Sequence, residues 1–192
     1  MTSGEQEIDW RLVLDANVLL QAPMRDTMLR LAQERIVTVF WSDAILAEVE
    51  RNFPKVSGAS DAARRFARLL SALRQHFPRA FVTEGEETMR VAAITSHDRH
   101  VLTCALAAPA PLKITYNIRH FPAHTLAPYS VQAWHPDRLL SALLLSHPDE
   151  LLAVLLAQGR DLHPPRSLHQ ILTRLADDVP GFVLQARQRF GL

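Results

Sequence analysis

The stretch Arg11–Asn17, RLVLDAN, decides how the rest of the chain is interpreted. Its apolar run, Leu12 to Leu14, is too short for a helix and favours a strand that is buried on both faces. The run ends at Asp15. A carboxylate at the end of a buried strand lies where open α/β sheets bind their ligands, but it can also cap the helix that follows. Both interpretations of Asp15 remain open from this segment alone.

Length and composition are typical of a globular protein. A chain of 192 residues with 48% hydrophobic and 21% charged residues predicts one domain, with enough apolar mass for a core and room for a small appendage. No apolar run is long enough to span a bilayer, and the polar, acidic amino-terminal stretch is unlike a signal peptide, so we expect a cytoplasmic protein with no membrane partner. The single cysteine, Cys104, excludes an intramolecular disulfide and is expected in the core.

The first two-thirds of the chain predict strands that alternate with helices. Pro23 is expected to break the first helical stretch, so that its main helix starts near Asp26, and residues 54–60 are expected to form a loop. The alternation predicts a parallel α/β sheet flanked by helices. The expected strands are 12–14, 36–41, 80–83, 112–116 and an edge strand at 130–134, and the main helices are 26–35, 42–53, 61–77 and 98–108.

After Trp134 the pattern becomes almost entirely helical. The tripeptide His-Pro-Asp occurs at 135–137 and 147–149, each time before a leucine-rich run. Proline and an acid in the first turn favour two helix starts over a paired metal motif. Gly159 is expected to end the second helix and Ser167 to cap a third, with a fourth at about 180–190. We therefore divide the chain into residues 1–134 and a C-terminal helical region, residues 135–192.

Three acids stand at informative positions along the predicted sheet. Asp15 ends the first strand, Glu48 lies in the helix after the second strand, and Asp98 begins the helix before the fourth. Strand ends and the helix starts that follow them gather at one edge of a parallel sheet, so Asp15 and Asp98 could converge there. Clustered carboxylates need a positive charge to neutralise them, and a hard divalent cation is the usual solution. Each acid also has a structural alternative, a helix cap for Asp98 and a surface position for Glu48, as for Glu50.

Four segments follow one another along the chain: LVLDANVLL at 12–20, WSDAILAEVERNF at 41–53, HDRHVLTCALAA at 97–108 and ITYNIRHFP at 114–122. In sequence and in order they resemble the PIN-domain family, whose members are metal-dependent nucleases and in many cases VapC-type toxins of bacterial toxin–antitoxin pairs. The tail resembles the extra C-terminal helical region of one bacterial branch of that family. The resemblance implies a PIN-like fold with a central parallel sheet, frequent homodimers, and RNA as the commonest substrate.

The resemblance also implies a set of site residues. Asp15, Glu48 and Asp98 are the implied catalytic acids and ligands of Mg²⁺ or Mn²⁺, with Glu48 preferred to Glu50. Further candidates are Asn17, Thr115 and Asn117, which would orient the ligands or hold water, and Arg99 and Arg119, which either contact substrate phosphate or are ordinary surface charges.

The chain departs from the family pattern where further acids are usual. Thr95 stands three residues before the third acid, and neither Asn117 nor His120 supplies the acid that usually belongs to the last motif. Three carboxylates suffice for one metal ion, and the missing acid argues against a second. His120 either replaces a lost ligand without binding metal, or is an imidazole ligand that shifts the preference towards Mn²⁺ or another transition metal.

From these residues and the resemblance we expect a metal-dependent endoribonuclease, the toxin of a type II toxin–antitoxin pair with a cognate antitoxin protein as partner. The alternative is a PIN-fold module that binds nucleic acid or protein with little or no catalysis, which the missing fourth acid would explain. A nuclease acting on structured DNA is a third, weaker hypothesis.

Overall fold

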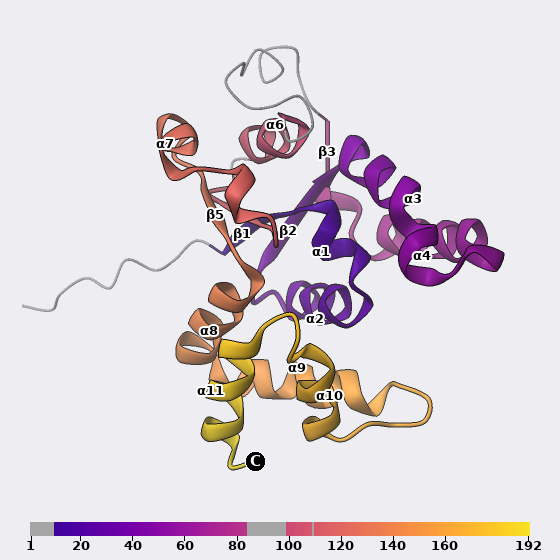
Figure 1. Cartoon of the computed structure of the whole chain (residues 1–192), viewed down its shortest axis with the longest axis vertical. Coiled ribbons are helices and arrows are strands. Elements are labelled where there is room, and N and C mark those ends of the chain that lie inside the picture. Colours follow the sequence, from indigo (N-terminus) through magenta and orange to yellow (C-terminus); the bar gives the residue numbers. More distant parts are fainter. Residues whose placement is uncertain (1–9, 84–98, 109) are drawn as a thin grey trace, which may run out of the picture.

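The computed structural model describes residues 10–83, 99–108 and 110–192. Strands and helices alternate up to β5, and helices follow one another from there to the C-terminus (Figure 1). The strands are β1 (Arg11–Leu14), β2 (Thr38–Ser42), β3 (Phe81–Val82), β4 (Leu112–Ile114) and β5 (Gln132–Trp134). The helices are α1 (Ala16–Leu20), α2 (Ala22–Gln33), α3 (Asp43–Ser57), α4 (Ala62–His76), α6 (Arg99–Ala107), α7 (Ala123–Leu126), α8 (Pro136–Ser146), α9 (Pro148–Arg160), α10 (Leu168–Leu175) and α11 (Pro180–Phe190).

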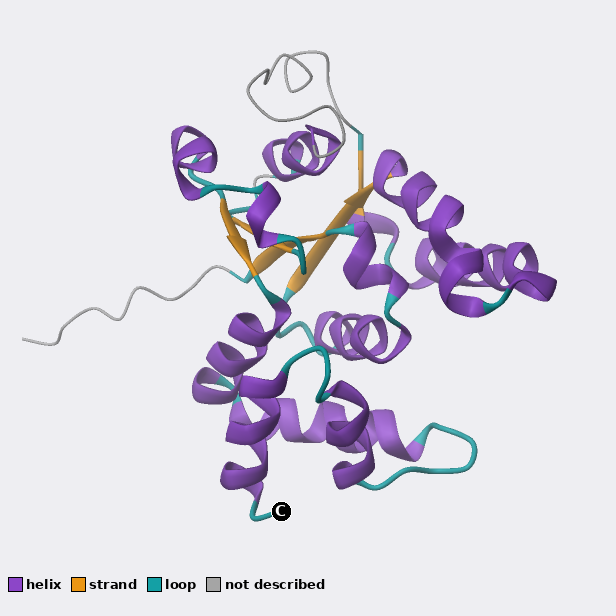
Figure 2. Ribbon diagram, in the orientation of Figure 1, coloured by secondary structure: helices purple, strands orange, loops and turns teal. Residues whose placement is uncertain are grey.

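In the described residues the strands form one sheet in the order β3-β2-β1-β4-β5. Every neighbouring pair is parallel, and the central strand β1 sets Val13 opposite Phe40 of β2 and Lys113 of β4. Helices lie on both sides of the sheet (Figure 2). The predicted parallel sheet flanked by helices, with additional helices after it, is therefore confirmed. No helix in these residues is both long enough and apolar enough to cross a membrane.

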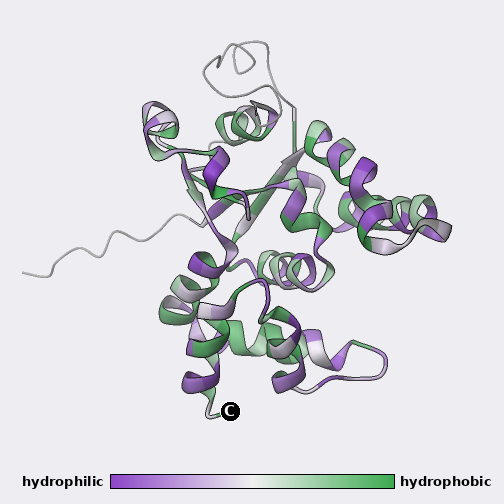
Figure 3. Ribbon diagram, viewed as in Figure 1, coloured by the Kyte–Doolittle hydropathy of each residue, from purple (hydrophilic) through white to green (hydrophobic). Residues whose placement is uncertain are grey.

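The hydrophobic core is centred on β1. Leu12, Val13 and Leu14 are completely inaccessible to solvent, as expected for a strand that is covered on both faces. On the β3 side, Trp41 is also fully buried and makes edge-to-face contacts with Phe77 and Phe81, at centroid distances of 6.0 and 5.8 Å. The central strands and α9 carry much of the hydrophobic colour in Figure 3.

Two prolines lie inside helices that were expected to be broken at those points. Pro23 occupies the first turn of α2, so this helix starts at Ala22 and not near Asp26. A first-turn N–H has no helical acceptor, and a proline there loses nothing. Pro54 lies within α3, which continues to Ser57 where a loop was expected from residue 54.

Side chains around Pro54 supply hydrogen bonds that support the last turns of α3. The amide of Asn52 donates to the carbonyl of Glu48 at 3.0 Å, and the Ser57 hydroxyl donates to the carbonyl of Phe53 at 2.8 Å. Gly58 then ends the helix with a φ of +79°, a left-handed conformation that favours glycine. The helix therefore ends at the glycine and not at the proline.

Both His-Pro-Asp tripeptides begin helices, as predicted. The ring Nδ1 of His135 accepts the N–H of Asp137 at the start of α8, and Ser167 forms a capping box with Gln170 at the start of α10. Gly159 does not end α9, which continues to Arg160. A Cβ at residue 159 would lie 2.3 Å from the carbonyl oxygen of Arg166, so the glycine allows the chain to pass closely there.

The C-terminal helices pack against α2 through α9 and α10. The buried side chain of Gln158 joins the two parts. Its Oε1 accepts the Thr27 hydroxyl at 2.8 Å, and its Nε2 donates to the Pro23 carbonyl at 3.0 Å. An ion pair between Arg30 and Asp161, at 2.9 Å, lies at the exposed margin of this contact. The division into residues 1–134 and 135–192 remains a prediction.

Candidate active site

Asp15 lies at the carboxyl end of the central strand, between β1 and α1. Its backbone is extended and its N–H continues the sheet by donating to the carbonyl of Ile114 at 3.0 Å. The side chain is 7% exposed, and its Oδ1 accepts the N–H of Ala16, the first residue of α1, at 2.7 Å. Asp15 therefore does cap a helix, but this bond uses only one of its two oxygens.

The second oxygen of Asp15 belongs to a hydrogen-bond network that crosses from α1 to the end of β4. Its Oδ2 accepts the hydroxyl of Thr115 at 2.6 Å and the amide of Asn17 at 3.1 Å. The Thr115 oxygen also accepts the Asn17 amide and the backbone N–H of Asn117, each at 3.0 Å. The amide oxygen of Asn17 accepts the N–H of Tyr116 at 3.2 Å, which fixes the direction of the amide. These bonds hold the Asp15 carboxylate in one orientation.

Lys113, which is not among the residues predicted from the sequence, also lies at this carboxylate. Its side chain is fully buried, with Nζ 3.8 Å from Oδ2 of Asp15, and the ammonium lies over the ring of Phe121. Because side chains alternate along a strand, Lys113 and Thr115 point to the same face of β4. A lone lysine within the apolar strand LKITY was the signal available in the sequence, since lysine is almost never fully buried unless it is paired.

Glu48 lies on α3 and its side chain is 33% exposed. Its Oε2 lies 3.1 Å from Nε2 of His100 on α6, whereas Glu50 is exposed. Helix periodicity left these two glutamates undistinguished. The structure distinguishes them by burial and by the histidine partner of Glu48.

The other predicted site residues are placed only in part. Asp98, Thr95 and the side chain of Arg99 lie outside the described residues. Arg119 and His120 lie in a 3₁₀ turn at Ile118–His120, and both are exposed. Asn117 is exposed too, and its recorded bond to Thr115 comes from the backbone and not from its side chain. Within the described part of the chain, no three His, Cys, Asp or Glu side chains are grouped closely enough to hold a metal ion.

The chemistry of the Asp15 and Glu48 side chains nevertheless suits a hard divalent ion. Asp15 offers a carboxylate that is already fixed in place, and Glu48 offers a second carboxylate that reaches solvent. Oxygen donors of this kind are those that Mg²⁺ and Mn²⁺ prefer.

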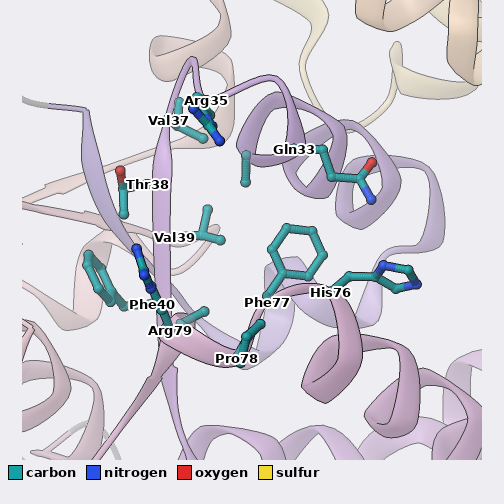
Figure 4. Close-up of a pocket in the computed structure, with 12 residues that line it drawn as sticks. Gln33, Arg35, Val37, Thr38, Val39, Phe40, His76, Phe77, Pro78 and Arg79 are labelled. Carbon is teal, nitrogen blue, oxygen red and sulfur yellow. The ribbon is translucent and has the colours of Figure 1, made fainter.

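A separate cavity of about 640 Å³ contains none of these residues. It lies beside β2, where Val37, Val39 and Phe77 form apolar walls and Arg35 and Arg79 add positive charge (Figure 4). The candidate active site at the carboxyl end of β1 is therefore distinct from this cavity.

The chain belongs to the PIN domain family, because the model of that family matches residues 11–119, more than half of the chain. It is 37% identical over 103 residues, 52% of its length, to VapC50 of Mycobacterium tuberculosis strain H37Rv, a protein named as a candidate ribonuclease. The chain spans 61% of the length of that relative. No solved structure is significantly similar to it.

Proposed function

We propose that this protein is a metal-dependent endoribonuclease that hydrolyses RNA phosphodiesters. The observation that carries the proposal is the buried carboxylate of Asp15 at the carboxyl end of β1, held by Thr115 and Asn17 in a chain of the PIN domain family. Parallel α/β sheets bind ligands at this edge. The similarity to a relative named as a candidate ribonuclease favours RNA as the substrate.

In this mechanism Asp15, Glu48 and Asp98 would hold one Mg²⁺ or Mn²⁺ ion. A divalent ion, when bound, supplies a more acidic water and neutralises charge on the phosphodiester. The protein contributes position: Thr115 and Asn17 fix the Asp15 carboxylate before substrate arrives, so that it need not reorient during the reaction. Nε2 of His100 on α6 lies 3.1 Å from Oε2 of Glu48 and would restrict where that carboxylate moves.

The remaining predicted residues have supporting roles in the proposal. Arg99 and Arg119 would contact substrate phosphates, Asn117 would hold water, and His120 would either replace a lost ligand without binding metal or be a further ligand. The resemblance to VapC proteins supports a cognate antitoxin as partner and a homodimer as the assembly. The apolar faces of the first helices and of the C-terminal region are the candidate surfaces for such a partner.

The test is cleavage of a panel of RNAs by the purified protein with Mn²⁺, with Mg²⁺ and with a chelator. Asp15→Asn should abolish cleavage, because the amide keeps the size of the side chain but removes the negative charge. Asp149→Asn, which changes an exposed acid in the first turn of α9, is the matched control and should cleave normally. Unchanged cleavage by a folded Asp15→Asn protein would contradict the proposed site.

The alternative, a PIN-fold binding module without catalysis, is favoured by the absence of an acid at both Asn117 and His120. Calorimetric titration with Mn²⁺ separates the two functions, because a nuclease of this kind needs a metal site and a binding module does not. Metal binding together with cleavage supports the nuclease. Neither binding nor cleavage would support the binding module.

A further inference from the structure

Lys113 places its side-chain ammonium group beside the carboxylate that we propose as a metal ligand. The lysine belongs to β4, which lies between β1 and β5, and none of its surface reaches solvent. Its Nζ is 3.8 Å from Oδ2 of Asp15, the same oxygen that accepts the bonds from Thr115 and Asn17. The ammonium therefore acts on the oxygen that is most firmly held in the site.

The surroundings of Lys113 make this charge effective. Phe121, which is 2% exposed, covers the ammonium with the face of its ring, an arrangement in which the ring quadrupole attracts a cation. Water is excluded on this side, so the attraction between the ammonium and the carboxylate is weakly screened by solvent or salt. A buried lysine is costly unless it is paired, and the carboxylate of Asp15 lies 3.8 Å from its Nζ.

We infer that Lys113 is a built-in counter-cation for Asp15, which holds the carboxylate in place before any divalent ion binds and weakens the binding of that ion. The inference rests on the proposed function in that it takes Asp15 to be a metal ligand. Lys113 is a positioning residue, because it acts through Asp15 and not on the substrate.

Two physical consequences follow. The protein is stable with Asp15 in place in the absence of metal, because the negative charge already has a partner. A divalent ion at Asp15 is repelled by the ammonium, and by linkage the ion weakens the attraction between the ammonium and the carboxylate to the same extent.

The first test replaces Lys113 with methionine, which keeps the length of the side chain but removes its charge. The thermal midpoint of the metal-free protein should fall, and calorimetry should show Mn²⁺ binding about 5- to 150-fold more tightly than to the wild type, the usual range for coupled sites. Added Mn²⁺ should raise the thermal midpoint of this variant more than that of the wild type. Lys55→Met, at an exposed lysine of α3, is the matched control and should change neither quantity. Equal Mn²⁺ affinities for Lys113→Met and the wild type would overturn the inference.

A second test needs no metal and remains informative if Lys113→Met folds poorly. Asp15→Asn leaves the buried ammonium without its carboxylate, so it should lower the thermal midpoint in the presence of chelator. The double variant Asp15→Asn/Lys113→Met removes both charges and should recover much of this loss. Additive effects of the two substitutions would show that the two groups are not coupled and would overturn the counter-cation role.

The two tests also separate this inference from the proposed function. If neither the wild type nor Lys113→Met binds Mn²⁺, the metal-dependent function fails, and so does the predicted weakening of metal binding. The coupling between Asp15 and Lys113 is measured in chelator and is decided independently of that result. Coupling with tighter Mn²⁺ binding by Lys113→Met supports both.

Discussion

The carboxyl edge of the sheet and the contact between α2 and α9 both bury polar side chains that come from distant parts of the chain. Asp15 and Thr115 are 100 residues apart, and Thr27 and Gln158 are 131 apart. The buried hydrogen bonds of the α2–α9 contact join neutral groups, whereas the sheet edge adds a carboxylate and an ammonium. Neutral pairs can be exchanged for apolar pairs at little cost, but a buried charge that loses its partner is strongly destabilising. Stability alone therefore does not explain why the charged groups of Asp15 and Lys113 are buried at the sheet edge.

The largest loss of stability is expected for a substitution in α9, at Gly159. Gly159→Ala sets a Cβ 2.3 Å from the backbone oxygen of Arg166, and a backbone atom cannot move aside cheaply. We expect urea denaturation to show a loss of about 3 kcal/mol. Gly181→Ala, where the Cβ would meet the more adaptable side chain of Asp137 at 2.6 Å, should lose less. An equal loss for both variants would show that backbone crowding at residue 159 is not the cause.

Thr115→Val tests the charged region directly. Valine matches the shape of threonine but loses three hydrogen bonds, those with Asp15, Asn17 and the N–H of Asn117. We expect unfolding experiments to show a loss of about 2 kcal/mol, together with a clear fall in RNA cleavage. Thr103→Val is the control, since its buried hydroxyl donates to the carbonyl of His100 within α6 and to no other acceptor among the described residues. A stable Thr115→Val protein with full cleavage would remove the hydroxyl from the site.

Gln158→Leu and Thr27→Val repeat the pair exchange at the neutral contact. Gln158→Leu alone should cost about 1.5 kcal/mol, because the Pro23 carbonyl and the Thr27 hydroxyl each lose a partner. The double variant should be less destabilised than the sum of the two single variants, as measured by denaturant unfolding. Cleavage should be unchanged in all three proteins. Loss of cleavage in any of them would mean that the α2–α9 contact supports the site.

The smallest expected effect concerns the pH dependence of stability at His135. Burial lowers the pKa of His135, more than the nearby carboxylates of Asp137 and Asp178 raise it. The unfolded chain therefore takes up this proton first as the pH falls. Stability that is present above the ordinary histidine pKa, about 6.5, is lost as the pH falls below it.

His135→Asn keeps a side-chain acceptor for the N–H of Asp137 but does not titrate. Thermal midpoints measured between about pH 7 and 5 should decline less steeply in this variant than in the wild type. His147→Asn, at the start of α9 where no side chain caps the helix, is the control and should keep the wild-type slope. An unchanged slope in His135→Asn would contradict the stated role of its burial.

Much of the fold follows from local patterns in the sequence. The apolar run at Leu12 and the capping residues Ser42 and Ser167 predict elements that the structure confirms, because strand burial and helix capping depend on near neighbours. The predicted helix end at Gly159 and the predicted loop from Pro54 were both wrong. The first depends on Arg166, which meets the glycine only after folding. In the second case α3 continues past the proline to Ser57 and ends before Gly58, whose φ is +79°.

The candidate site shows the same division between local and distant information. Asp15 was found from its position at a strand end, and the grouping of Asn17 and Thr115 around it followed from the family resemblance. Lys113 was missed, because nothing local says which buried acid faces a lysine on a strand about a hundred residues further along the chain. The roles of Glu48 and Asp98 as ligands remain predictions, since Asp98 lies outside the described residues.

The strand order has a consequence for the synthesis of this protein. β1 can pair with β2 as soon as the first part of the chain has left the ribosome, but its other neighbour, β4, is translated much later. Chains begin to fold from the N-terminus while they are being made. A nascent chain that ends before β4 carries Asp15 without Thr115 or Lys113, and its carboxylate is not yet held in place. For a nuclease that acts on RNA, this order would protect the messenger and the ribosome until most of the protein is complete.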